Sequence, residues 1–136
     1  MTSQAAHEIC KSLGMPGKPK ILIVEDDSDV RRLYAIGLNQ RGFQVKLAAN
    51  GAEAVERIGT ERPDVVLLDW LMPLMNGREV LAKLGEHGHG ELTVIVISGE
   101  PAPPLEGRDP RIQSWLTKPV SMDELVVEIE RPVASR

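Results

Sequence analysis

The sequence predicts an α/β fold: a doubly wound sheet of five parallel strands with helices on both of its faces. Short apolar runs alternate along the chain with segments whose apolar residues have helical spacing. Such runs indicate strands buried on both faces, which belong to parallel sheets covered by helices. In the clearest case, residues 65–68, the run is followed at once by Asp69. Ligands of open α/β sheets gather at that end of the strands.

The composition is that of a globular protein with one domain. The chain has 136 residues, of which 42% are apolar and 26% charged, and this length supports one hydrophobic core. Its net charge of −4 argues against a direct nucleic-acid partner, which needs clustered Lys and Arg. The single cysteine, Cys10, favours a reducing compartment. No run approaches the roughly 18 apolar residues of a membrane span, so we expect a cytoplasmic chain with no membrane partner.

The first strand leads into a group of acids. Residues 1–19 contain several Gly and Pro residues, and we expect a flexible N-terminal extension there. The apolar run 21–24 follows and ends in Glu25, Asp26 and Asp27. One acid is enough to stabilise the N-terminus of the next helix. Three acids therefore indicate a further role for this strand end.

A helix, an edge strand and a second helix are expected next. Helical spacing runs from Ser28 to Arg41, with Gly42 as the terminator. The apolar positions of this helix are Val30, Leu33, Tyr34 and Leu38. In the strand that follows, Phe43, Val45 and Leu47 alternate with polar residues, as in a half-buried edge strand. Asn50 and Glu53 then predict a helix start, and Pro63 stops that helix.

The third helix follows the central strand. Asn76, with Glu79 three residues later, predicts its N-terminus, and residues 85–90 are expected to be a loop. Two histidines, His87 and His89, lie in that loop. Because no third His or Cys lies nearby, we interpret them as part of a solvated turn, and not as a metal site.

The segment 100–111 is rich in residues that break helices. It follows the fourth apolar run, residues 93–97, and Ser98. The helix breakers are Pro101, Pro103, Pro104, Gly107 and Pro110. Proline lacks an amide donor and clashes with the preceding helical turn. We therefore expect a shortened or irregular fourth helix.

The last strand and helix complete the pattern. Residues 114–117 indicate a short fifth strand before Lys118, and Ser121 begins a capping box for the last helix. Pro132 ends that helix, so residues 132–136 are a C-terminal tail. A tight turn must aim the Lys118 ammonium back over the sheet edge, which predicts a cis peptide bond to Pro119, since X-Pro is the linkage where cis costs little.

The strand order brings polar residues together. Right-handed crossovers favour the flavodoxin-like order 2-1-3-4-5, in which the first and third strands are neighbours. Glu25 and Asp26 then lie beside Asp69, and the neighbouring strand ends add Ser98 and Lys118.

This cluster suits phosphoryl transfer. Grouped carboxylates raise one another's pKa unless a cation compensates, and hard oxygen ligands of this kind suit Mg²⁺. With a metal masking its charge, Asp69 could attack phosphorus. Lys118 and the Ser98 hydroxyl would hold the other phosphoryl oxygens.

At these residues the sequence closely resembles the receiver domain of two-component response regulators, from about Lys20 to Arg131. The matching motifs are Ile21 to Asp26, Leu68-Asp69 with Met72-Pro73 and Gly77, Ser98-Gly99, and Lys118-Pro119. The resemblance also points to the cis peptide bond before Pro119.

The resemblance implies a role for each site residue. Asp69 is expected to be the phosphoacceptor, and Glu25 and Asp26 are expected to hold Mg²⁺ together with the backbone carbonyl of Leu71. Ser98 is the expected switch hydroxyl. Trp115 occupies the place of the family's switch aromatic residue, although it could equally be a core residue.

One departure concerns the family's output surface. A full helix usually follows the position of Ser98 in the family, and here that segment is proline-rich. The phosphorylation site is complete, whereas the usual output surface is expected to differ.

We expect a stand-alone receiver that takes a phosphoryl group from a histidine kinase or a histidine phosphotransfer protein and then binds a downstream protein target. It is expected to catalyse only its own Mg²⁺-dependent phosphorylation and dephosphorylation. The alternatives are a fragment of a longer regulator and a degenerate receiver that binds partners without phosphorylation. A haloacid-dehalogenase-like phosphatase needs a second Asp two residues after the nucleophile, and Leu71 occupies that place.

Overall fold

The computed structural model describes residues 18–86 and 92–131. The predicted loop with His87 and His89, the tail 132–136 and nearly all of the predicted extension 1–19 lie outside the described residues. Within the described part, five strands are β1 (Lys20–Val24), β2 (Gln44–Ala48), β3 (Val65–Asp69), β4 (Thr93–Ser98) and β5 (Ile112–Thr117). The helices there are α2 (Ser28–Gln40), α3 (Gly51–Glu61), α4 (Gly77–Glu86) and α5 (Met122–Glu130).

The strands form one parallel sheet in the order β2-β1-β3-β4-β5. This confirms the predicted doubly wound, flavodoxin-like arrangement. In the register of the three central strands, Ile23 lies opposite Leu67, and Leu67 lies opposite Ile95. The polar residues that follow these strands therefore come to the same edge of the sheet.

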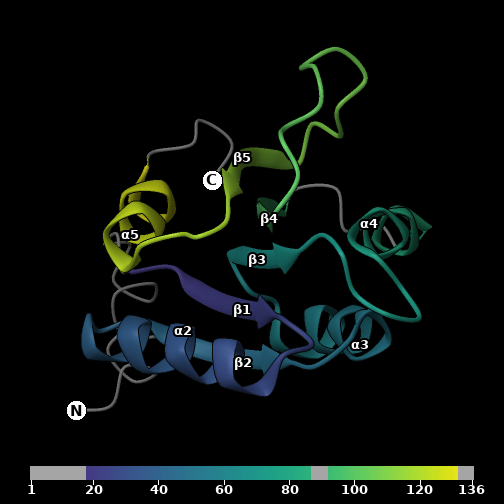
Figure 1. Cartoon of the computed structure of the whole chain (residues 1–136). Coiled ribbons are helices and arrows are strands. Elements are labelled where there is room, and N and C mark those ends of the chain that lie inside the picture. The colour runs from purple at the N-terminus through teal and green to yellow at the C-terminus, as the bar shows by residue number, and fades with distance from the viewer. Residues whose placement is uncertain (1–17, 87–91, 132–136) are drawn as a thin grey trace.

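Helices cover both faces of the sheet, as Figure 1 shows. Alternate residues of each central strand point to opposite faces, so the core has two layers. Leu22, Leu68 and Val96 pack with α3 and α4 in one layer. In the other layer, Ile23 and Leu67 pack with α2 and α5. Both layers hold the central strands β1, β3 and β4 in place, and with them the residues at their ends.

The helix starts follow the predicted caps. The side chain of Asn50 accepts a hydrogen bond from the Glu53 amide at 2.8 Å, and that of Ser121 accepts one from the Glu124 amide at 3.1 Å. At the start of α4, Asn76 and Glu79 each accept a hydrogen bond from the other's amide. These side chains satisfy amides that have no partner within the helix.

Several predicted details were wrong. Of the predicted apolar positions in α2, Leu38 is buried but Leu33 is 67% exposed, and in β2 Leu47 is 37% exposed. Val45 packs into the layer with α2, but Leu47 lies outside both layers of the core. Strand β5 begins at Ile112, two residues before the predicted start. Helix α4 continues into the expected loop as far as Glu86.

The segment 100–111 contains no helix, which confirms the prediction of an irregular fourth helical segment. Figure 1 shows it as a long loop that rises away from the sheet between β4 and β5. In the part of the chain that the structure describes, no helix is long and apolar enough to cross a membrane.

Candidate functional site

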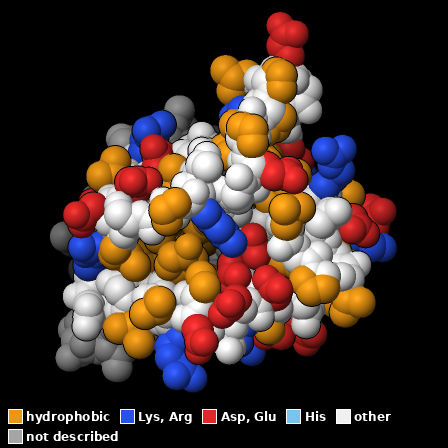
Figure 2. Space-filling view, viewed as in Figure 1, with side chains coloured by type: hydrophobic (Ala, Val, Ile, Leu, Met, Phe, Trp, Pro, Cys, Tyr) orange, Lys and Arg blue, Asp and Glu red, His pale blue; other side chains and the backbone are white. Residues whose placement is uncertain are grey.

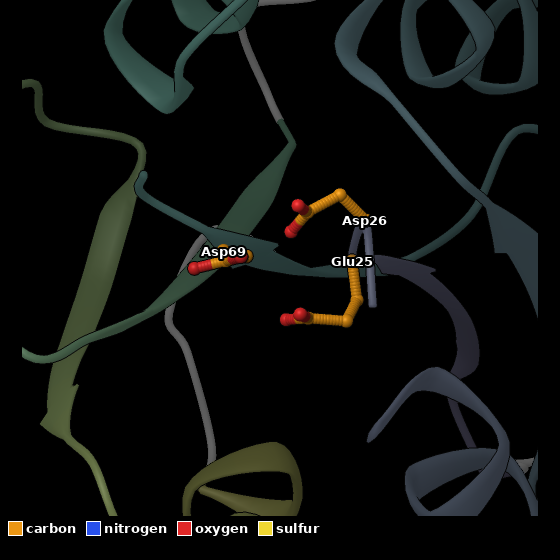
Figure 3. Close-up of side chains that lie close together, drawn as sticks. All are labelled: Glu25, Asp26 and Asp69. Atoms are coloured by element: carbon orange, nitrogen blue, oxygen red, sulfur yellow. The ribbon is translucent and has the colours of Figure 1, made fainter. Parts of the chain in front are cut away.

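Three carboxylates meet at the carboxyl edge of the sheet, and Figure 2 shows acidic side chains gathered near the centre of this face of the molecule. Glu25 and Asp26 follow β1, and Asp69 is the last residue of the neighbouring strand β3. One oxygen atom from each side chain lies within 4.8 Å of the others. Figure 3 shows the carboxyl groups of Glu25 and Asp26 extending toward Asp69. The structure therefore brings together the acids that the sequence predicts as metal ligands.

Lys118 supplies a positive charge to the same site. Its Nζ lies 3.3 Å from Asp69 Oδ1 and 4.0 Å from Glu25 Oε2. The peptide bond between Lys118 and Pro119 is cis, the isomer predicted from the sequence. Because Asp69 is buried, this ion pair is shielded from water more than a surface pair would be.

The hydroxyl of Ser98 lies at the end of β4, next to the strand that carries Asp69. Ser98 is buried, and it follows Ile97, the register partner of Asp69. Its Oγ accepts a hydrogen bond from the amide of Glu100 at 3.0 Å. Its carbonyl oxygen accepts one from the Lys118 amide at 2.8 Å. The backbone thus connects two of the predicted site residues.

Trp115 lies in β5, and its indole is hydrogen-bonded to Glu100, the residue whose amide donates to Ser98. Its Nε1 donates a hydrogen bond to the carbonyl oxygen of Glu100 at 2.9 Å. The indole also packs against that of Trp70, with ring centroids 5.0 Å apart and planes inclined by 58°. The peptide backbone of Glu100 therefore contacts both Ser98 and Trp115, a link that the sequence did not reveal because backbone atoms make it.

The electrostatics of the site favour a bound cation. Burial, reinforced by the charge of Asp69, raises the pKa of Glu25 to about 7. Burial also raises the pKa of Asp69, although Lys118 opposes this. Burial alone would lower the pKa of Lys118, but the two carboxylates outweigh it and raise that pKa. Both carboxylates are therefore held in a site where their charge is not fully compensated.

A buried oxygen supports the fit of a metal. Glu25 Oε2 has no hydrogen-bond partner among the described residues, whereas Oε1 accepts a bond from the Asp27 amide at 3.3 Å. A buried carboxylate oxygen without a hydrogen bond is costly, and a cation coordinated by the three acids would reduce that cost. Carboxylate oxygens are the ligands that Mg²⁺ prefers.

Two other predicted residues are placed by the structure. Asp27 is the N-cap of α2. Its side chain accepts hydrogen bonds from the amides of Asp29 and Val30 and so stabilises the start of the helix. Leu71 lies two residues after Asp69, with an exposed side chain. The role of its carbonyl in binding metal stays a prediction.

One residue near the site was missed by the sequence reasoning. The guanidinium of Arg31, in the first part of α2, donates a hydrogen bond to the carbonyl oxygen of Glu25 at 2.7 Å. This bond connects the segment that carries Glu25 and Asp26 to α2. The sequence contains two neighbouring arginines here, Arg31 and Arg32, and their pattern alone does not show which one turns back.

The comparison with known families agrees with this geometry. The family described as "Response regulator receiver domain" matches residues 21–130. The chain belongs to this family. All the residues described above as site residues lie within the matched part.

Individual relatives support the same assignment. The chain is 34% identical over 112 residues to "Response regulator MprA" of Mycolicibacterium vanbaalenii, covering 81% of this chain and 48% of that protein. It is 32% identical over 111 residues to "Transcriptional regulatory protein SrrA" of Staphylococcus aureus, covering 82% of this chain and 46% of the relative. This receiver thus spans about half the length of these curated relatives.

Solved structures have the same fold. The receiver domain of the Francisella response regulator 1452 superposes with a TM-score of 0.74 at 30% identity, covering 82% of this chain and 93% of that one. The chemotaxis protein CheY4 of Vibrio cholerae gives a TM-score of 0.73 at 26% identity, covering 84% and 98%.

Proposed function

We propose that this receiver accepts a phosphoryl group on Asp69 from a histidine kinase or a histidine phosphotransfer protein, in the presence of Mg²⁺. The phosphorylated form would then bind a downstream protein target. We place this exchange in the cytoplasm, the compartment that the cysteine content favours. In this role the receiver catalyses only its own phosphorylation and dephosphorylation.

The observation that carries the proposal is the position of Asp69 between a cation and two further acids. Lys118 Nζ lies 3.3 Å from one of its oxygens, and Glu25 and Asp26 bring their oxygens within 4.8 Å. An ordinary surface carboxylate needs no such surroundings. Phosphoryl transfer depends mainly on positioning and on neutralising charge, and this site offers both.

The transfer step follows from these positions. An Asp69 carboxylate oxygen attacks the phosphorus atom, and the bond to the donor's nitrogen or oxygen breaks, with its electron pair leaving on the donor. Lys118 neutralises charge on the phosphoryl oxygens, while the Ser98 hydroxyl donates a hydrogen bond to one of them. Glu25, Asp26 and Asp69 would hold Mg²⁺, which supplies further charge neutralisation when bound.

Two alternatives differ from this proposal in how the receiver would act. A degenerate receiver would bind partners without phosphorylation, and the complete acidic site together with Lys118 argues against it. The relatives of about twice this length show that such receivers also occur within longer regulators. A stand-alone receiver would act on a separate protein. A receiver within a longer regulator would act on a neighbouring domain of the same chain.

The direct test is phosphorylation by acetyl phosphate with Mg²⁺, followed by intact mass spectrometry. The wild-type protein should gain one phosphoryl group, and EDTA should prevent this. Asp69→Asn should gain none, because an amide is a poor nucleophile. Asp29→Asn is a matched control, because Asp29 is an exposed acid on α2. Equal labelling of Asp69→Asn and wild type would refute the assignment.

A further inference from the structure

We propose that the cavity between α4 and the loop 100–111 is a binding site for a small planar aromatic anion, such as an aromatic carboxylate or sulfonate. The cavity has a volume of about 350 Å³, which is at the lower end of the roughly 300–1,000 Å³ typical of small-molecule sites. Glu25, Asp26, Asp69 and Lys118 do not line it. The proposed site is therefore distinct from the acidic cluster and Lys118, although Trp115 lies between the two and lines the cavity.

The cavity lies between α4 and an irregular loop. The segment 100–111 rises from the sheet beside α4 (Figure 1), and its base is fixed. Arg111 Nη2 donates a hydrogen bond to the carbonyl oxygen of Leu81 in α4 at 2.7 Å, and it forms an ion pair with Asp109 at 2.7 Å. These bonds hold the loop against α4 and leave a space between them.

The interior walls are apolar and aromatic. The apolar residues that line it are Trp70 and Trp115, Leu81 and Ala82 of α4, and Pro103 and Pro104 of the loop. The Trp70 indole packs directly against Gly77, where an added Cβ would lie 2.4 Å from the ring. The inclined indoles expose aromatic surface to the cavity, and a third aromatic ring can pack there in an offset or edge-to-face arrangement.

The rim gives the site its preference for an anion. Arg78 and Arg108 both line the cavity. Arg78 makes no hydrogen bond or ion pair with the described residues. Arg108 donates to the Pro103 carbonyl oxygen through Nη2, while its Nε is buried without a partner in the described chain.

The acidic residues of the rim do not cancel this charge. Asp109 is paired with Arg111, which leaves Glu106 as the remaining acid that lines the cavity. Two guanidinium groups against one carboxylate give the rim a net positive charge in a protein whose overall net charge is −4. Arginine pairs with carboxylate and sulfonate groups and stacks on aromatic rings. A ligand with a flat ring and one negative group complements both features.

The test uses two fluorescent probes with the same ring system. The anionic probe is 8-anilinonaphthalene-1-sulfonate, and the neutral probe is N-phenyl-1-naphthylamine. Both should bind the wild-type protein, with the anionic probe binding more tightly. Ala82→Phe fills the cavity from α4 and should weaken both probes by at least about tenfold, a change of about 1.4 kcal/mol. Ala52→Phe, at an equally exposed helical alanine on α3, should change neither affinity.

A second variant tests whether the cavity prefers an anion. Replacing Arg78 and Arg108 together by Gln should weaken the anionic probe roughly fivefold, as expected for two partly exposed charges, and leave the neutral probe within about twofold. Far-UV circular dichroism checks that each variant is folded. Unchanged affinities in Ala82→Phe, or loss of binding in Ala52→Phe, would overturn the site. Equal weakening of both probes by the double Gln variant would overturn the anion preference.

Discussion

Glu25 is a buried carboxyl group whose protonation depends on what else occupies its site. It is only 2% exposed, and burial together with Asp69 raises its pKa to about 7 from an ordinary value of 4.5. Between these two pH values the folded protein keeps a proton that the unfolded chain has lost. The metal-free protein should therefore lose stability as the pH rises from about 4.5 to about 7.

The first prediction follows from this linkage. In EDTA, the free energy of unfolding should fall between pH 5 and pH 7 by on the order of a few kcal/mol, since each pKa unit corresponds to about 1.4 kcal/mol. Glu25→Gln should flatten this fall, and Mg²⁺ should restore the stability of wild type at pH 8 by binding only the folded state. Urea unfolding at a series of pH values measures how the free energy of unfolding depends on pH. An equal slope in Glu25→Gln would assign the proton to another group.

The adjacent acids Asp26 and Asp27 should differ in function although they differ little in chemistry. Asp26 contributes an oxygen to the acidic cluster, whereas Asp27 caps α2. We predict that Asp26→Ala lowers Mg²⁺ affinity at least about tenfold, because a charged ligand is lost. Asp27→Ala should instead cost about 1 kcal/mol of stability. Fluorescence of Trp70 during a Mg²⁺ titration measures the affinity, and the opposite pattern would exchange the two assignments.

At the scale of single elements, the loop 100–111 is the segment in which we expect the response to phosphorylation. It lacks the regular ladder of helical hydrogen bonds, and its first part contacts both Ser98 and Trp115. Segments with few such bonds open at low free energy. We predict fast amide exchange from Ala102 to Gly107. Exchange at Glu100 should become slower when beryllofluoride, a phosphoryl mimic, is bound to Asp69. Hydrogen exchange with mass spectrometry tests this, and α3 is the internal control. Slow exchange across the loop, unchanged by the mimic, would place the response elsewhere.

Most elements could be predicted from the sequence, but several of their contacts could not. Buried runs, caps and helix breakers predicted the strands, the helix starts at Asn50, Asn76 and Ser121, and a shortened or irregular helical segment at 100–111. The exposure of Leu33 and Leu47 could not be predicted, because spacing shows that a face is apolar but not how far a neighbouring helix extends over it. The hydrogen bonds of Arg31 and Glu100 depend on tertiary geometry, and no local pattern encodes them.

At the scale of the whole molecule, two core layers share one sheet. Both tryptophans pack against the layer with α3 and α4, whereas Leu38 lies in the layer with α2 and α5. Because every central strand contributes to both layers, the two should unfold together.

We therefore predict that Leu38→Ala and Leu84→Ala each destabilise the protein by about 2–5 kcal/mol and keep a single transition. Urea unfolding followed by tryptophan fluorescence and by far-UV circular dichroism should give coincident curves for both variants. Leu33→Ala, at an exposed position on the same helix as Leu38, should change stability by less than about 0.5 kcal/mol. Separate fluorescence and dichroism transitions in Leu38→Ala would mean that the layers are independent.

The backbone of Glu100 has a consequence for how this protein can change during evolution. Its amide donates to Ser98 and its carbonyl accepts from Trp115, so the contact between hydroxyl and indole does not use the Glu100 side chain. Nineteen amino acids provide that amide, and proline alone lacks it. Drift at this position would leave both hydrogen bonds intact, so the residue could vary while its backbone still links the Ser98 hydroxyl to the Trp115 indole.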